Sequence, residues 1–133
     1  MKQYILIYLA SALGFFALDM VWLGLIAKNF YREKLSFIFT GEVDWKAAAL
    51  FYSLYFAGLF YFGILPGLKD GNWTTVLLNS ALFGFFCYAT YDFTNKATIL
   101  QWPWIVVGVD LIWGVVVTSF GGLVGFWVSK LLK

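Results

Sequence analysis

The chain has 133 residues, of which 62% are hydrophobic, 23% are aromatic and only 12% are charged, with a formal net charge of +2. Roughly a quarter of the residues in an ordinary soluble domain are charged, so this composition predicts an integral membrane protein. No basic cluster favours nucleic-acid binding. The sequence contains no histidine, which excludes His-ligated zinc and His-rich di-iron chemistry. We therefore expect neither a metal nor a cofactor.

Four apolar runs predict an all-α fold, with four transmembrane helices in an antiparallel bundle. Each run is long enough, at about 1.5 Å per residue, to cross or nearly cross a hydrocarbon core of about 30 Å. Asp19 and Asp110 are the only charged residues within these runs. The predicted helices cover residues 4–27, 47–65, 74–91 and 103–129, within a single domain of residues 1–133.

The segments between the runs predict where the helices end. After Lys28, the chain mixes apolar and polar residues as far as Lys46, so we expect this stretch to lie on the membrane surface. The second helix should stop at Pro66, and the short loop after it makes the second and third helices antiparallel neighbours. The fourth helix should begin at Pro103, a preferred first-turn position for proline.

Polar residues follow the third predicted helix, where Asp92, Asn95 and Lys96 form an interfacial cluster. We expect this cluster to lie near solvent, with Asn95 or Thr94 capping the helix. Trp102 and Trp104 are typical of interface anchors.

Glycines near the end of the fourth helix, Gly121 and Gly125, have the GxxxG spacing that allows close helix packing. We expect them to form an ordinary contact inside the bundle.

The two acids inside the runs lie at one predicted depth. Asp19 lies eight residues before the end of the first helix and Asp110 lies seven after Pro103, so both lie about 10 to 12 Å below the same face. Each acid is followed three residues later by a tryptophan, Trp22 or Trp113, on the same side of its helix. Ionisable groups at membrane depth are costly, and they therefore indicate function.

These four residues, Asp19, Asp110, Trp22 and Trp113, form the candidate binding site. Two neighbouring acids in a low dielectric could share a proton, and indole faces could enclose a cation. The structural alternative is that the acids only form hydrogen bonds across helices, or that one of them pairs with Lys96 to hold the bundle together.

Two segments resemble a bacterial family of small membrane proteins, the domain-of-unknown-function family 2177. They are residues 17–24 together with 28–31, and residues 91–98 together with the Trp-Pro-Trp at 102–104. The run Asp-Phe-Thr-Asn-Lys at 92–96 is its most specific part, and the resemblance covers essentially the whole chain. It implies a four-span protein of the bacterial inner membrane and carries over no activity.

A looser similarity links the chain to small multidrug transporters, which also have four short helices and an acid in the first. This chain has aspartate in place of glutamate, a longer first loop and a second acid in its fourth helix. We treat this likeness as an analogy.

Three functions are compatible with the sequence. The first is binding or proton-coupled transport of a lipophilic or cationic small molecule between the acids. The second is a lipid-modifying enzyme that uses Asp19 or Asp110 as acid or base, while Lys96 and Asn95 hold a head group. The third is an accessory subunit that packs through its glycine face. We expect membrane lipids as partners and leave a homo-oligomer open.

Orientation in the membrane is not decided by charge. An even number of spans places four basic residues on the face of the termini and five on the other. This difference is too small for the positive-inside rule to choose between the two orientations.

Overall fold

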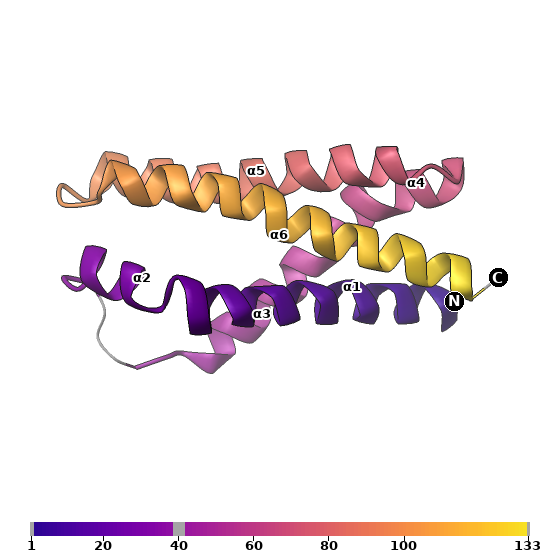
Figure 1. The fold of residues 1–133 in the computed structure, drawn as a ribbon, viewed down its shortest axis with the longest axis horizontal. Helices are drawn as coiled ribbons and strands as arrows, with labels where there is room; N and C mark the ends of the chain where they lie inside the picture. The colour runs from indigo at the N-terminus through magenta and orange to yellow at the C-terminus, as the bar shows by residue number, and fades with distance from the viewer. Residues whose placement is uncertain (1, 39–41, 133) are drawn as a thin grey trace.

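The computed structural model describes residues 2–38 and 42–132, and these residues confirm an all-α fold (Figure 1). The chain forms four long helical rods. The first, Lys2–Ile26, ends in a π-helical turn, the second, Trp45–Asp70, contains one, and the other two are unbroken α-helices. The elements are α1 (Lys2–Val21), η1 (Trp22–Ile26), α2 (Lys28–Lys34), α3 (Trp45–Gly58), η2 (Leu59–Ile64), α4 (Leu65–Asp70), α5 (Trp73–Thr98) and α6 (Trp104–Leu131).

Three of these helical stretches are long and apolar enough to cross a membrane. They are Lys2–Ile26, Trp45–Asp70 and Trp104–Leu131. Helix α5, with 26 residues, is similar in length, but it carries more polar side chains and is not among the three. The described residues therefore contain three candidate spans, and the predicted count of four is not confirmed.

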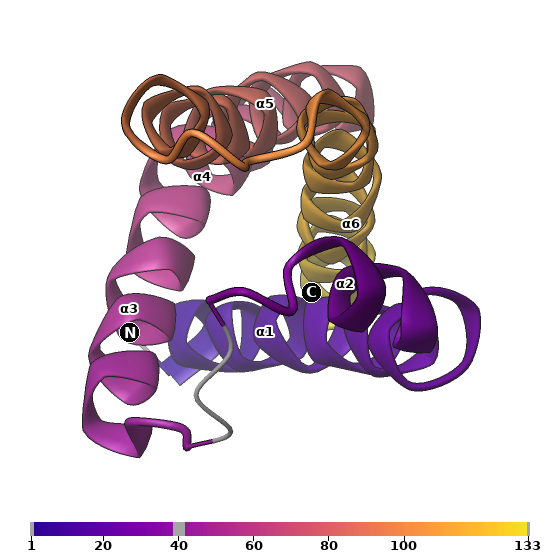
Figure 2. The same ribbon diagram turned by 90° about the vertical axis from the view of Figure 1, so that its left-hand side faces the viewer.

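The rods form a bundle whose end-on view places α1 opposite α5 and α3 opposite α6 (Figure 2). The turn between α4 and α5 lies at the same end as the start of α1 and the end of α6. Helix α2 and the turn between α5 and α6 lie at the other end (Figure 1). Helices α5 and α6 run side by side, and η2 and α4 pack on α5 while α3 diverges from it.

The second rod passes the position where we expected it to stop. Asp44 caps its start, since its carboxylate accepts the N–H groups of Lys46 at 3.0 Å and Ala47 at 3.1 Å. Pro66 has no N–H to give to the preceding turn, and the wider π turn of η2 lies immediately before it. The rod ends at Gly71, whose φ of 65° is the left-handed conformation that glycine adopts without strain.

The third helix also continues beyond its predicted end at residue 91, because residues 92–98 remain helical in α5. The threonine hydroxyls there donate to carbonyls of the preceding turn, as Thr98 does to Thr94 at 2.8 Å. Thr94 and Asn95 therefore lie inside the helix, and the prediction that they cap its end was wrong.

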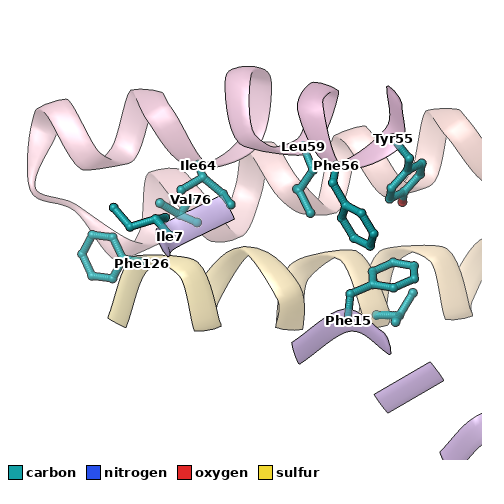
Figure 3. Close-up of a cluster of buried hydrophobic side chains, with 9 residues drawn as sticks. Ile7, Phe15, Tyr55, Phe56, Leu59, Ile64, Val76 and Phe126 are labelled. Atoms are coloured by element: carbon teal, nitrogen blue, oxygen red, sulfur yellow. The ribbon is translucent and has the colours of Figure 1, made fainter. Parts of the chain in front are cut away.

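A cluster of apolar and aromatic side chains fills the centre of the bundle (Figure 3). Ile7, Ile64, Val76 and Phe126 gather toward the end that holds the α4–α5 turn, whereas Phe15, Phe56 and Tyr55 lie toward the other end. Aromatic edges join α1 to α3, where the rings of Phe15 and Phe56 lie 5.2 Å apart.

Glycines set the distance between α6 and its neighbours. A Cβ on Gly121 would lie 3.2 Å from Phe15 of α1, and one on Gly125 would lie 3.3 Å from Ser11. The expected internal role of the GxxxG pair is confirmed. Between α5 and α6 the approach is closer, since a Cβ on Gly84 would meet the backbone carbonyl oxygen of Gly114.

We predict that Gly84→Ala destabilises the bundle, because a backbone carbonyl cannot rotate away and the two helices must separate. Overpacking of this kind costs about 1 to 3 kcal/mol of unfolding free energy. Gly108→Ala is the matched control, since a Cβ there meets nothing within 4 Å. Thermal unfolding in detergent, followed by circular dichroism, should show a lower midpoint for Gly84→Ala alone. Equal midpoints would show that α5 and α6 are not packed this closely.

Candidate functional site

A chain of aromatic and carboxyl groups crosses the end of the bundle that contains α2. It begins at Asp19 of α1, which is 5% exposed and whose Oδ1 accepts the indole N–H of Trp113 at 3.0 Å. The sequence places Trp113 three residues after Asp110, yet its indole bonds to the acid of the other helix. The crosswise bond is made by Trp113 alone, since the indole N–H of Trp22 donates to Tyr31 and not to Asp110.

The two predicted tryptophans stack on each other. The rings of Trp22 and Trp113 lie 4.5 Å apart with an interplanar angle of 12°. Trp22 is the first residue of the π-helix η1, which follows α1 without a break. The structure therefore brings Trp22 and Trp113 together, as a stacked pair between the two acids.

Tyr31 of α2 connects this stack to the second acid. Its hydroxyl accepts the indole N–H of Trp22 at 3.3 Å and donates to Oδ1 of Asp110 at 2.5 Å. Burial, followed by the hydrogen bond to Asp110, raises the pKa of Tyr31 above its ordinary value, so the phenol stays a donor at neutral pH. The stretch that we expected on the membrane surface thus sends a side chain into the bundle.

Asp110 has a partner that the depth argument did not assign to it. The carboxyl groups of Asp92 and Asp110 are neighbours that can share a hydrogen bond. Asp92 has no solvent-exposed surface, whereas we expected it near solvent in an interfacial cluster. Because α5 continues past residue 91, Asp92 lies within the helix and faces α6.

The position of Asp92 leaves one polar atom unsatisfied. Its Oδ1 accepts the indole N–H of Trp102 at 3.3 Å, while its buried Oδ2 has no hydrogen-bond partner. A proton held between Asp92 and Asp110 would supply the missing donor, and it would prevent two carboxylate charges from lying side by side.

Of the remaining members of the predicted interfacial cluster, Lys96 bonds to the residue that donates to Asp92, whereas the backbone of Asn95 bonds at the end of α5. Lys96 donates to the backbone carbonyl of Trp102 at 2.7 Å, and its ammonium group lies 5.4 Å from the ring of Trp104. Asn95 is half-buried, and its backbone carbonyl accepts the N–H of Ile99 at 2.7 Å. Trp102 is 1% exposed, so its interpretation as an interface anchor was wrong.

A pocket opens beside Asp110 where α3 diverges from α5. Its volume is about 350 Å³. The lining residues are mostly aromatic, and one of them is acidic: Phe51, Tyr55, Cys87, Tyr88, Tyr91 and Asp110. Tyr55 is fixed by a hydrogen bond of 2.6 Å between its hydroxyl and that of Thr118 on α6.

The four predicted site residues therefore belong to one connected arrangement, although Asp19 and Asp110 do not bond to each other. Sequence reasoning missed Tyr31 as a link, and it missed Asp92 as the acid beside Asp110. The signal available in the sequence was Asp92 itself, an acid one residue beyond the predicted end of the third helix. That predicted end placed Asp92 outside the bundle. Within the described residues, no three His, Cys, Asp or Glu side chains are grouped to hold a metal ion.

Comparison with known proteins places the chain among membrane proteins. A family model described as "Predicted membrane protein (DUF2177)" matches residues 4–127. No curated protein and no solved structure has significant similarity to the chain.

We predict that Tyr31→Phe loosens α2. The change removes a hydrogen bond to a carboxyl group, worth about 1.5 to 3 kcal/mol, and the exposed Lys28, Arg32 and Lys34 then become better trypsin sites. Cleavage in α2 should be faster by on the order of tenfold, because it follows the population of the opened segment. Tyr61→Phe, at a tyrosine that is 63% exposed, is the matched control. Unchanged cleavage in Tyr31→Phe would show that Tyr31 does not hold α2 in place.

Proposed function

The chain belongs to this family of predicted membrane proteins, and on that premise we propose that it binds a lipophilic monocation within the membrane in exchange for a proton. The membrane would be the inner membrane of a bacterium. The observation that carries the proposal is the aromatic pocket of about 350 Å³ with Asp110 in its wall and Asp92 behind it.

The proposal includes α5 as a fourth membrane span. At about 1.5 Å per residue, its 26 residues reach about 39 Å, enough for a hydrocarbon core of about 30 Å. Its polar residues Ser80 and Asp92 are fully buried against neighbouring helices, whereas Leu82 and Phe86 are more than half exposed. Helix α5 would therefore present apolar side chains to lipid, and its exposed threonines at 90, 94 and 98 donate their hydroxyls to carbonyls of the preceding turn.

The pocket has the chemistry that a lipophilic cation requires. The faces of Phe51, Tyr55 and Tyr88 offer cation–π attraction, and the carboxylate of Asp110 supplies the charge. Two lining residues, Phe51 and Tyr91, are 55% and 58% exposed, so the pocket reaches the surface of the bundle, from which a lipophilic molecule could enter. An anion or a sugar would find too few hydrogen-bond donors among these rings.

The carboxyl pair supports the exchange of a proton for the cation. In the empty site, Asp92 and Asp110 hold one proton and carry one negative charge between them. A cation that reaches Asp110 stabilises the state in which both carboxyl groups are ionised, so the shared proton leaves as the cation arrives. Tyr31 and the stacked pair of Trp22 and Trp113 fix the orientation of Asp110 through successive contacts. Asp19 holds the far end of that stack through Trp113.

The two other functions have weaker support. A lipid-modifying enzyme would need Lys96 free to hold a head group, but its ammonium group donates to the carbonyl of Trp102. An accessory subunit would need an open glycine face, but Gly121 and Gly125 pack against α1 and Ile64. Self-association of the chain would have to use another surface.

Binding can be tested with tetraphenylphosphonium as the probe and Cys87 as the reporter. Cys87 lines the pocket and is the only cysteine in the sequence. The probe should slow the reaction of Cys87 with a lipophilic maleimide in the purified, detergent-solubilised protein, and it should release a proton that a pH indicator detects in weak buffer. Asp110→Asn should weaken this protection at least about tenfold, because a carboxylate partner is lost.

Asp92→Asn separates binding from proton exchange. An amide at position 92 can donate to Asp110 and keep it ionised, so the cation should still protect Cys87 but release no proton. Asp70→Asn, which removes an exposed acid at the other end of the bundle, should leave both readouts unchanged. Equal protection in Asp110→Asn and the unmodified protein would disprove the proposed site.

The fourth span has its own test in a Cys87→Ser background. Asp70→Cys and Gln101→Cys introduce exposed thiols beyond the two ends of α5. We predict that a membrane-impermeant maleimide labels only one of the two in sealed vesicles, and that it labels both after detergent is added. Labelling of both from one side would show that α5 does not cross the membrane.

A further inference from the structure

A second pocket lies at the opposite end of the bundle, where the first turn of α1 meets α4 and the last turns of α6. Its volume is about 240 Å³. The inner wall is apolar and includes Ile7, Leu68 and Phe126, while the rim carries Lys69 and Lys130. The buried acids Asp19, Asp92 and Asp110 do not line this pocket, and the aromatic pocket beside Asp110 shares no lining residue with it.

The two lysines come from different rods and converge on the same opening. Lys69 lies in the last turn of α4, and Lys130 lies near the end of α6. The ammonium group of Lys130 lies 5.0 Å from the ring of Phe126, and it lies close to the α4–α5 turn at Gly71. Both lysine side chains are exposed, so their charges are available to a ligand at the rim.

The remaining polar groups hold the pocket in shape. The side-chain amide of Gln3 donates to the carbonyl of Leu132 at 2.9 Å, and this bond ties the start of α1 to the end of α6. The hydroxyl of Ser129 donates to the carbonyl of Phe126 at 2.6 Å. Asp70 is the acid nearest in sequence to the rim lysines, and it is exposed and does not line the pocket.

We propose that this pocket binds the phosphate of an anionic phospholipid, with the head group between Lys69 and Lys130 and the start of an acyl chain against Phe126 and Leu68. A paired cationic rim over an apolar wall matches the division of a lipid into phosphate and hydrocarbon. The position of the pocket at a bundle end also matches, because head groups lie at the ends of membrane-spanning helices.

The test is retention of added lipid by the full-length protein, purified in detergent and measured by native mass spectrometry. Phosphatidylglycerol should be retained more strongly than phosphatidylcholine. The double variant Lys69→Gln and Lys130→Gln should weaken phosphatidylglycerol retention by on the order of tenfold. The matched control is Lys28→Gln with Lys34→Gln, which removes the same charge from exposed residues at the other end and should retain the lipid.

Three results would overturn the proposal. They are equal retention of the two lipids, equal loss in the two double variants, and full retention in the variant that lacks the rim lysines. Inorganic phosphate distinguishes a lipid from a free anion: it should not displace phosphatidylglycerol at matched concentration, because it cannot use the apolar wall. Displacement would show that the pocket binds phosphate alone. Circular dichroism of each variant confirms that the helices are retained.

Discussion

The close approach of α5 and α6 is the constraint on which the rest of this structure depends. Gly84 and Gly114 remove the side chains that would separate the two helices, and a Cβ at either position would collide with the neighbouring helix. This contact also sets the register that brings Asp92 of α5 to Asp110 of α6. Neighbouring acids inside an apolar bundle are destabilising unless they are paired or protonated, so the packing that stabilises the fold also brings together two groups that need compensating partners.

The structure reduces this cost by surrounding the acids with donors that are themselves rigid. Trp102, Tyr31 and Trp113 each donate to a carboxyl oxygen. Trp102 comes from the turn between α5 and α6, and Tyr31 comes from α2, both at the same end of the bundle. Indole and phenol groups suit this role because they provide one polar atom on a large apolar body. The arrangement still leaves Oδ2 of Asp92 without a partner, and a proton shared with Asp110 would fill this position.

The two ends of the bundle have opposite chemistry. One end holds the buried acids beside an aromatic pocket, and the other holds a smaller pocket with two lysines at its rim. The divergence of α3 from α5 opens the first pocket, whereas the packing of α4 and η2 on α5 closes the bundle at the second. Both parts belong to one rod, since α3 continues through the π turn of η2 into α4 without a break.

Composition and helical spacing are local properties of the chain, and they were enough to predict the all-helical membrane class and the apolar runs and to select Asp19, Asp110, Trp22 and Trp113 as candidate site residues. Tertiary structure decided which of these groups meet. The crosswise bond from Trp113 to Asp19, the reach of Tyr31 to Asp110 and the burial of Asp92 all depend on contacts between segments far apart in sequence. No local pattern encodes these contacts, since Tyr31 and Asp110 are 79 residues apart in the chain and Trp113 and Asp19 are 94 residues apart.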